Sequence, residues 1–253
     1  MGKIYDKYAE IYDATGQDEF GKRMLRDLRE ILQEAGVKPR QALDIACGTG
    51  TVAVLLAQEG IKVWGVDASD RMLAVARRKA KSLSLPVTFI RQDMRSLELG
   101  QTFDLVTCFY DAINYILCEA ELQTVFDKVS QHLDPGGVFV FDANTVHALR
   151  DVWGNNSFAD VEEDIAYIWN NRYHPETGLA VLTATFFVRK PDLGDDVYER
   201  FVEIHVEKGY PIDKLASMLE ESGLKVIKQY AHGKSRPATE EDTRVVFVAQ
   251  KPS

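Results

Sequence analysis

Apolar and polar positions along the first 143 residues follow two alternating patterns, one helical and one strand-like. Apolar side chains recur every three or four residues in the segments 20–35, 51–58, 70–81 and 121–133, which predicts amphipathic helices. Short apolar runs lie between them at 42–46, 61–66, 87–90, 103–108 and 138–141, with a turn at 134–137 (Asp-Pro-Gly-Gly). Helices that alternate with short buried strands are typical of an α/β fold with a mostly parallel sheet.

The pattern changes after residue 143. Three runs between Ile165 and Val206 alternate apolar and polar side chains with no helix between them, and residues 175–178 (Pro-Glu-Thr-Gly) predict a hairpin turn. A helix at 212–222, ended by Gly223, and strands at 225–230 and 244–250 then resume the α/β pattern. We therefore expect one α/β domain of seven strands in residues 1–143 and 211–253. Residues 144–210 are expected to form a small antiparallel β insertion after the fifth strand.

Composition narrows the classes of function. Of the 253 residues, 45% are hydrophobic and 27% are charged, and the net charge is −9, which disfavours nucleic acid because its phosphates are also negative. No apolar run approaches the roughly 18 residues of a membrane span, and the first residues lack the apolar core of a signal peptide. Cys47, Cys108 and Cys118 have no metal-ligand spacing, so we expect reduced thiols and no metal site. These features predict a cytoplasmic protein without a membrane or nucleic-acid partner.

Three signals follow three successive strands. The first is Asp44-x-x-x-Gly48-x-Gly50, where glycines let the backbone approach a ligand and the next helix presents free N–H groups. The second is Asp67, placed to accept hydrogen bonds from the two hydroxyls of a ribose. The third is Asp93-Met94, an acid and an apolar side chain suited to the amine and face of adenine. Because open α/β sheets bind ligands at the carboxyl ends of their strands, the three together predict a nucleoside-containing ligand.

A dinucleotide is the main alternative ligand. Residues 48–53 also fit the G-x-G-x-x-[GA] fingerprint, and Asp67 could hold the ribose of NAD, as in an NAD-dependent oxidoreductase. However, the carboxylate of Asp44 would repel a pyrophosphate, and pyrophosphate binding does not require an acid four residues before Gly48. This feature favours another nucleoside.

The segment 42–50 (Ala-Leu-Asp-Ile-Ala-Cys-Gly-Thr-Gly) resembles motif I of the class I S-adenosylmethionine-dependent methyltransferases. Residues 66–73, 92–94, 103–108 and 133–137 are similar to their later motifs. This resemblance implies a Rossmann-like seven-stranded sheet, S-adenosylmethionine as methyl donor and S-adenosylhomocysteine as product. It implies that Asp44 and the loop 46–50 face the methionine end, that Asp67 holds the ribose, and that Phe109 offers its backbone to the methionine amine. The cofactor-binding residues that it implies are Tyr12, Arg23, Asp44, Ala46, Gly48, Gly50, Asp67, Ala68, Met72, Asp93, Met94 and Phe109.

The N-terminal run Tyr5-Asp6-x-Tyr8-x-x-x-Tyr12-Asp13 is similar to the opening of the small-molecule branch, which includes glycine/sarcosine and amino-sugar N-methyltransferases. In that branch the segment closes over the cofactor, and an arginine on the next helix, here Arg23, meets its carboxylate. An amphipathic helix packed on the domain would explain the same tyrosines. The resemblance therefore implies a small-molecule methyl acceptor, reacting through N or O.

The acceptor site is harder to read because a sulfonium methyl is already activated, so that a general base is optional for an amine and useful for a hydroxyl. The candidate catalytic residues are Tyr8, Tyr110, Asn114 and His205, and Asp111, Tyr115 and Tyr173 are further polar candidates. Alternation with Ile204 and Val206 would equally let His205 face solvent. The insertion could shape the acceptor pocket or form a homodimer contact, and the whole fold could instead serve as a non-catalytic cofactor-binding module.

Overall fold

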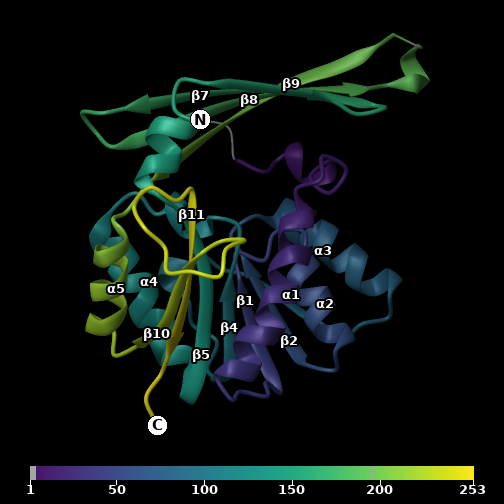
Figure 1. Ribbon diagram of the computed structural model, residues 1–253. Helices are drawn as coiled ribbons and strands as arrows, with labels where there is room; N and C mark the ends of the chain where they lie inside the picture. The colour runs from purple at the N-terminus through teal and green to yellow at the C-terminus, as the bar shows by residue number, and fades with distance from the viewer. Residues whose placement is uncertain (1–3, 195) are drawn as a thin grey trace.

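The computed structural model describes residues 4–194 and 196–253, and its core is a seven-stranded sheet of order β10-β11-β5-β4-β1-β2-β3 (Figure 1). Strands β1 to β5 are parallel, and β11 pairs antiparallel with both β5 and β10. This confirms the predicted α/β fold. The strands are β1 (Gln41–Ile45), β2 (Lys62–Asp67), β3 (Thr88–Arg91), β4 (Phe103–Cys108), β5 (Leu133–Asn144), β10 (Lys225–Ala231) and β11 (Arg244–Gln250).

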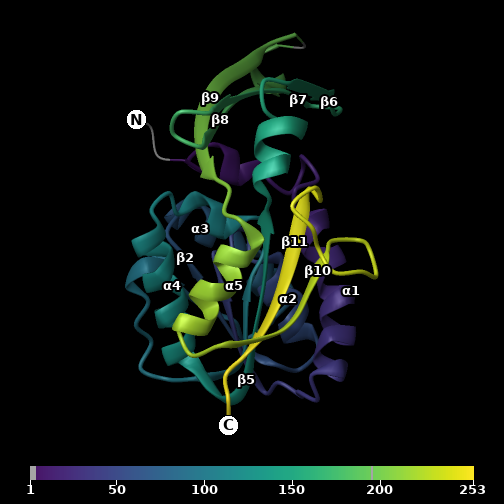
Figure 2. The same ribbon diagram turned by 60° about the vertical axis from the view of Figure 1, so that its left-hand side comes forward.

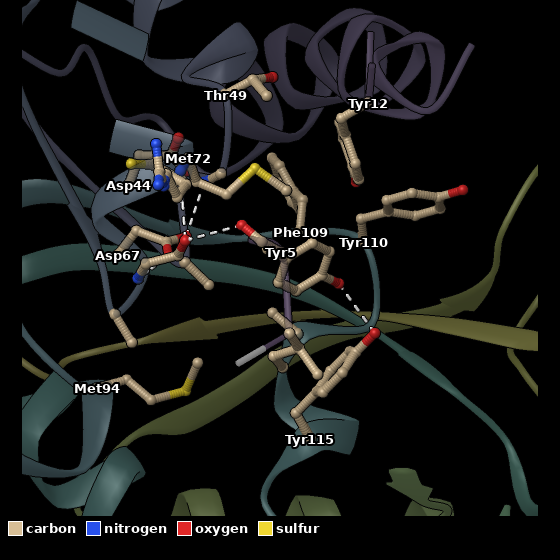
Figure 3. Close-up of a pocket in the computed structure, with 18 of the residues that line it drawn as sticks. Tyr5, Tyr12, Asp44, Thr49, Asp67, Met72, Met94, Phe109, Tyr110 and Tyr115 are labelled. Carbon is tan, nitrogen blue, oxygen red and sulfur yellow. Dashed lines mark hydrogen bonds between the residues drawn. The ribbon is translucent and has the colours of Figure 1, made fainter. Parts of the chain in front are cut away.

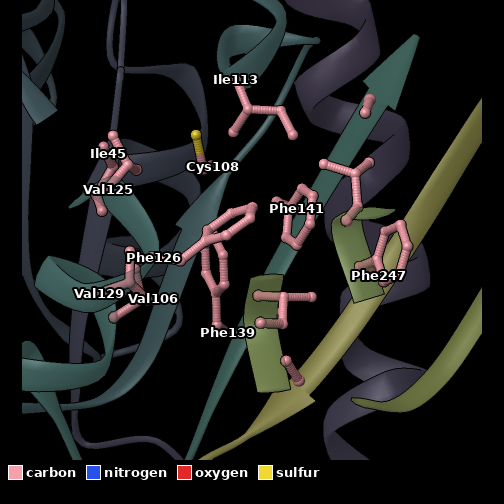
Figure 4. Packing of buried hydrophobic residues seen from close by; sticks show 14 of the residues in the cluster. Ile45, Val106, Cys108, Ile113, Val125, Phe126, Val129, Phe139, Phe141 and Phe247 are labelled. Atoms are coloured by element: carbon pink, nitrogen blue, oxygen red, sulfur yellow. The ribbon is translucent and has the colours of Figure 1, made fainter. Parts of the chain in front are cut away.

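Helices cover both faces of this sheet because its central strands carry apolar side chains on both sides. On β5, Phe139 and Phe141 pack with one cluster that includes residues of α4 and α5, as Figure 4 shows. Val138 and Val140 alternate with these phenylalanines along the strand, so they point to the other face and pack with α1 and α2. The helices are α1 (Asp18–Glu34), α2 (Thr51–Gln58), α3 (Asp70–Ser82), α4 (Glu119–His132) and α5 (Ile212–Glu221). None of the helices in the described ranges is long and apolar enough to cross a membrane.

A second sheet, the lid sheet, is formed by β6 (Ser157–Val161), β7 (Ile165–His174), β8 (Leu179–Arg189) and β9 (Tyr198–Lys208) in that order, all antiparallel. It lies within the predicted insertion, and both views place it across the end of the main domain (Figures 1 and 2). The three predicted runs form β7, β8 and β9, and β6 is a fourth strand that was not predicted. Its five residues are all exposed, so it carries no apolar face that a sequence pattern could reveal.

The predicted turn at 134–137 lies inside a strand. β5 begins at Leu133, and its register against β4 shifts between the pairs Phe103–Leu133 and Leu105–Val138. The intervening residues therefore bulge out of the ladder, and Gly136 has the positive φ of 80° that such a kink requires. Gly136 N–H donates to the carbonyl of Lys251, which ties this bulge to the chain beyond β11.

The N-terminal segment, residues 4–17, runs between the lid sheet and α3 (Figures 1 and 2). It contains only one short 3-10 turn, η1 (Tyr8–Glu10), so the amphipathic helix considered for its tyrosines was wrong. Ion pairs join it to α3, with Asp6 to Arg71 at 3.3 Å and Asp13 to Lys79 at 2.8 Å. The segment is thereby held over the carboxyl ends of the parallel strands.

Candidate active site

A cavity of about 710 Å³ opens at the carboxyl ends of β1, β2, β3 and β4, beneath the N-terminal segment (Figure 3). Its volume falls in the range of about 300–1,000 Å³ that is usual for small-molecule sites. The parallel strands explain its composition, because they bring the residues that follow each strand to one edge. The lining includes Tyr5, Tyr12, Asp44, Ala46, Gly48, Asp67, Ala68, Met72, Asp93, Met94, Phe109, Tyr110 and Tyr115.

The loop between β1 and α2 has a backbone that few side chains allow. Gly50 has φ 76°, and a Cβ there would lie 2.8 Å from Cβ of Ala76 and 3.1 Å from the ring of Phe89. Gly48 also has a positive φ of 53°, yet a Cβ there would meet no described atom within 4 Å. Gly50 is thus required by packing against α3, whereas Gly48 leaves an open cradle beside the cavity.

Asp44 is the deepest carboxyl group of the site. It is only 2% exposed, and its Oδ1 accepts a hydrogen bond from the Thr107 hydroxyl at 2.7 Å. Its Oδ2 is buried without a hydrogen-bond partner among the described residues. Burial raises the pKa of Asp44 to about 7, an effect that the Thr107 hydrogen bond opposes and the nearby charge of Asp67 reinforces. An unpartnered buried carboxyl oxygen on a cavity wall favours a ligand that brings a donor or a positive charge.

Asp67 ends β2 and belongs to the cavity wall. Its two oxygens accept hydrogen bonds from the backbone N–H of Gly48 at 2.9 Å and of Ser69 at 2.8 Å. The N-cap of α3 is Ser69, whose hydroxyl accepts from Met72 N–H at 3.3 Å. The carboxylate of Asp67 is therefore not used as a helix cap, and it bridges the glycine loop to the start of α3. Burial raises its pKa from the ordinary aspartate value.

Asp93 and Met94 form the third wall, after β3. Asp93 accepts hydrogen bonds from the backbone and side chain of Arg95, at 2.9 and 3.0 Å, and these bonds lower its pKa. It is therefore an ionised acceptor in the working pH range. Figure 3 shows the Met94 side chain on the Asp67 side of the cavity, away from the tyrosines.

Aromatic side chains form the other end of the cavity. Tyr5 and Tyr12 come from the N-terminal segment, and Phe109, Tyr110 and Tyr115 follow β4. The hydroxyls of Tyr5 and Tyr115 are 2.9 Å apart. Tyr5 and Tyr110 have positive φ values of 59° and 63°, which non-glycine residues adopt rarely and mostly where the surrounding structure imposes them. The polar strand ends and this aromatic wall give the cavity two chemically different halves.

Comparison with known proteins decides the class. Residues 42–137 match a family described as a methyltransferase domain. A protein of Geobacillus sp. (strain WCH70) named as a methyltransferase is 37% identical over 98% of this chain and 99% of its own length. A solved S-adenosylmethionine-dependent methyltransferase from Clostridium acetobutylicum ATCC 824 superposes with a TM-score of 0.85 at 29% identity, covering 99% of this chain and 100% of that one. The chain belongs to the S-adenosylmethionine-dependent methyltransferases.

More distantly, the chain is similar to the dTDP-3-amino-3,6-dideoxy-alpha-D-glucopyranose N,N-dimethyltransferase of Streptomyces fradiae. That enzyme is 33% identical over 141 residues, which cover 56% of this chain and 53% of the enzyme. Membership of the methyltransferases removes the NAD-dependent oxidoreductase as an alternative.

The site fits S-adenosylmethionine on two structural observations. The free Oδ2 of Asp44 offers an acceptor to a cationic group, and Gly48 leaves space where any Cβ would protrude. The same loop could have accepted a dinucleotide, but a buried carboxyl group at Asp44 suits a cation and not a pyrophosphate. When bound, the cofactor supplies an activated methyl group on a positively charged sulfur.

Several residues predicted for this methyltransferase site do not line the cavity. Arg23, expected to meet the cofactor carboxylate, has its guanidinium 5.9 Å from the Phe20 ring centroid. Asp111 is partly buried and forms an ion pair with Arg244 at 2.7 Å. Of the predicted cofactor and acceptor residues, those outside the described cavity lining are Tyr8, Arg23, Gly50, Asp111, Asn114, Tyr173 and His205.

The side chain of Asn114 binds backbone groups of two strands. Its amide nitrogen donates to the carbonyls of Asn144 at 3.0 Å and Lys208 at 2.8 Å, and its oxygen accepts from Asn144 N–H at 2.9 Å. With three backbone partners the amide joins β5 and β9 to the turn after β4. This use leaves the expected catalytic role of Asn114 without structural support.

His205 and Tyr8 lie directly behind the aromatic wall. His205 is 3% exposed, so the expectation that it could face solvent was wrong: β9 turns this side chain toward the main domain. Its Nδ1 is 3.0 Å from the Tyr115 hydroxyl. Tyr8 packs on Phe186 of the lid sheet, with ring centroids 4.3 Å apart.

Sequence reasoning missed Glu203, the neighbour of His205 on the same face of β9. Its carboxylate accepts backbone hydrogen bonds from Tyr5 at 2.6 Å and from Asp6 and Tyr8 at 3.1 Å each. The two-residue spacing of Glu203 and His205 places them on one face of a strand and could have signalled a shared site. The backbone partners of Glu203, however, lie almost 200 residues earlier in the chain, and the hydrogen-bond partner of His205, Tyr115, lies 90 residues earlier.

Proposed function

We propose that this methyltransferase transfers the methyl group of S-adenosylmethionine to the nitrogen of a small amine bound at the aromatic end of the cavity. The observation that carries the proposal is the four-tyrosine wall, Tyr5, Tyr12, Tyr110 and Tyr115, which offers ring faces and hydroxyls to a cationic or polar amine. The arginines of the cavity lining are engaged in ion pairs with carboxylates of the same lining. Arg71, Arg91 and Arg95 pair with Asp6, Asp70 and Asp93.

The relatives support a small acceptor. The enzyme of Streptomyces fradiae is named for dimethylation of the amino group of a nucleotide-linked amino sugar, and its similarity covers 56% of this chain. The acidic net charge of −9 adds to the argument against a nucleic-acid acceptor. Attack on a sulfonium methyl needs alignment of the acceptor and exclusion of water more than it needs a catalytic triad. In this proposal the N-terminal segment and the lid sheet cover the cavity and serve both purposes.

We assign the cofactor to the polar half of the cavity. In this proposal Asp44 and the loop at Ala46 and Gly48 face the methionine end, and Asp67 binds the ribose. Ala68, Met72, Asp93 and Met94 surround the adenine, and Tyr12 and Phe109 lie between cofactor and acceptor, all in accordance with their places in the lining. Gly50 acts through the backbone of the loop, by letting it approach α3.

The proposed reaction is tested with a panel of small primary and secondary amines, matched hydroxyl compounds and carboxylates. Release of S-adenosylhomocysteine is followed at saturating methyl donor, and the products are identified by mass spectrometry. We expect turnover with amines, including amino sugars, and N-methylated products. Turnover confined to hydroxyl compounds would contradict the assignment to nitrogen, and silence across the panel would favour the non-catalytic binding module.

Binding of S-adenosylhomocysteine is expected to release a proton near neutral pH. The pKa of about 7 means that Asp44 is partly protonated in the free protein, and the ammonium group of the ligand would favour the carboxylate form. Affinity should therefore rise as pH increases from 5.5 to about 7.5 and then level off. Calorimetry in buffers of different ionisation enthalpy measures the proton released. Asp44→Asn should bind more weakly with no proton release; an unchanged release would place the titrating group elsewhere.

The lid sheet is assigned to the acceptor side. Its inward residues Ala184 and Phe186 pack on Tyr8 of the N-terminal segment, which supports the role of an acceptor lid over that of a homodimer contact. Sedimentation at micromolar concentration separates the two: a monomer is expected, and a stable dimer that dissociates on substitution of outward residues of the lid sheet would contradict the assignment. We also propose a cytoplasmic location, which the free thiols of Cys47, Cys108 and Cys118 support.

A further inference from the structure

A chain of hydrogen-bonding groups leads from the cavity into the lid sheet. The Tyr5 hydroxyl, on the cavity wall, is 2.9 Å from the Tyr115 hydroxyl (Figure 3). The Tyr115 hydroxyl is 3.0 Å from Nδ1 of His205, and Nε2 of His205 is 3.7 Å from the Glu203 carboxylate. The first three side chains are therefore linked at hydrogen-bond distance, and the Glu203 carboxylate lies at ion-pair distance from the His205 ring.

The direction of these hydrogen bonds follows from the state of His205. Burial lowers its pKa to about 4, so the ring is neutral at physiological pH and only one nitrogen carries a proton. The Glu203 carboxylate beside Nε2 favours the proton there, which leaves Nδ1 as an acceptor. Tyr115 must then donate to His205, and Tyr5 must donate to Tyr115.

The other groups packed around His205 are not alternative hydrogen-bond partners for the Tyr115 hydroxyl. Burial raises the pKa values of the Tyr5 and Tyr115 hydroxyls well above the ordinary tyrosine value, so both keep their protons. From the N-terminal segment Tyr8 also faces His205, with ring centroids 6.4 Å apart, and its hydroxyl is 3.3 Å from Thr15. On β9, Glu207 lies near Tyr115 but accepts a hydrogen bond from Asn144 at 3.0 Å, and burial raises its pKa to about 8.

Glu203 also binds the backbone of the N-terminal segment. Its two oxygens accept the backbone N–H groups of Tyr5, Asp6 and Tyr8, and Tyr5 O accepts from the Ser69 hydroxyl at 3.4 Å. The carboxylate that orients His205 thus also holds the backbone of Tyr5 over the cavity. Glu203 therefore acts on both His205, through Nε2, and Tyr5, through its backbone N–H.

We propose that Glu203, His205 and Tyr115 are positioning residues that orient the Tyr5 hydroxyl as a hydrogen-bond acceptor for the N–H of the methyl acceptor. The inference rests on the proposed function, since it assigns a residue to the amine that is methylated. With its proton committed to Tyr115, the Tyr5 oxygen has only lone pairs to offer the cavity. Such an acceptor suits an N–H or ammonium group and disfavours a bare carbonyl.

This orientation matters most during the transfer. The nitrogen lone pair forms the new N–C bond while the S–C bond breaks and its electron pair goes to sulfur, so the positive charge passes from sulfur to nitrogen. The N–H becomes more acidic as this charge develops, and its hydrogen bond to the Tyr5 oxygen strengthens. The proton stays on nitrogen during the step and leaves to water after product release. An interaction that strengthens in the transition state raises kcat more than it lowers KM.

The test compares His205→Leu with His205→Asn, because the asparagine Oδ1 occupies nearly the place of Nδ1 and can accept from Tyr115. With the best amine of the panel, His205→Leu and Tyr115→Phe should each lower kcat by about 10- to 100-fold, within the range of one oriented catalytic hydrogen bond. His205→Asn should recover most of that loss. The double variant Tyr115→Phe/His205→Leu should be no slower than either single variant, since the histidine acts through the tyrosine. Affinity for S-adenosylhomocysteine should stay unchanged throughout.

Two substitutions in the lid sheet serve as matched controls. His174→Asn on β7 and Tyr198→Phe on β9 change the same residue types where the side chains are 39% and 48% exposed, and both variants should leave kcat unchanged. Additive losses in the double variant, or a His205→Asn variant as slow as His205→Leu, would overturn the positioning role in favour of a general packing effect.

Nitrogen-15 NMR of histidine-labelled protein separates this inference from the proposed function. We expect His205 to be neutral with its proton on Nε2 at pH 7, and the Nδ1 shift should change in Tyr115→Phe. A proton on Nδ1, or a charged ring, would overturn the orientation whatever the acceptor is. The expected tautomer together with no turnover of any amine would instead refute the proposed function, and with it the assignment of Tyr5 to an amine.

Discussion

Gly50→Ala is expected to destabilise the protein by about 2–5 kcal/mol, of which the left-handed backbone contributes about 1–2 and the steric overlap about 1–3. Gly50 has φ 76°, and its added Cβ would lie 2.8 Å from Cβ of Ala76, a backbone-linked atom of α3 that cannot rotate away. Either the loop or α3 must move, and both carry walls of the cavity. The free energy of unfolding from urea titration measures the effect, and binding of S-adenosylhomocysteine should weaken with it.

Gly60→Ala separates the two causes of this loss. Gly60 has a similar φ of 84°, but an added Cβ would meet no described atom within 4 Å. It should therefore cost only the conformational share, about 1–2 kcal/mol, and leave cofactor affinity unchanged. Equal destabilisation by the two variants would show that contact with α3 does not constrain the loop, contrary to the geometry.

Asp67→Ala is expected to weaken binding of S-adenosylhomocysteine by about 10- to 150-fold, the equivalent of about 1.5–3 kcal/mol for a charged hydrogen bond. Asp67 lines the cavity, and its carboxylate also accepts the N–H groups of Gly48 and Ser69, so its removal loosens the loop that holds the ligand. Asp67→Asn keeps one oxygen as an acceptor and should lose less. Isothermal titration calorimetry at pH 7.5 measures all three proteins.

Deoxyadenosine analogues refine this experiment. If Asp67 binds the ribose hydroxyls, Asp67→Ala should lose less affinity for an analogue of S-adenosylhomocysteine that lacks one hydroxyl than it loses for the natural ligand. Asp213→Ala, a carboxylate in the first turn of α5, is the control and should bind normally. Undiminished affinity of Asp67→Ala would remove the ribose role.

The methyl-donor half of the site was predictable from the sequence because every signal in it is local. Asp44 lies near the end of a short apolar run, Asp67 and Asp93 follow two others, and parallel strands deliver such residues to the same edge. The glycines between β1 and α2 likewise report a backbone conformation that neighbouring residues impose. The fold class and a nucleoside-binding edge of the sheet could therefore be predicted without tertiary information, and the resemblance to the methyltransferase motifs added the methyl donor.

The acceptor half depended on contacts that no local pattern carries. Alternation along β9 assigns Glu203 and His205 to one face, but which face turns inward is decided by how the lid sheet packs on the N-terminal segment. The strand β6 was not predicted, and all five of its residues are exposed. Asn114, a candidate catalytic residue by its position after β4, has backbone partners at Asn144 and Lys208 that no local pattern reveals. A polar residue near a strand end has the same sequence signature whether it joins strands or faces a ligand.

The feature that most separates sequence from structure is the contact between Glu203 and the backbone of Tyr5, which are 198 positions apart in the chain. The sequence by itself determined the parallel sheet, the glycine loop and the three carboxylates of the cofactor half, because these follow from strand direction and local backbone geometry. Only the tertiary structure decided how the tyrosines, His205 and Glu203 meet over the cavity. That arrangement depends on the packing of the N-terminal segment against β9, two elements far apart in the chain, and the pattern of neither element alone reveals it.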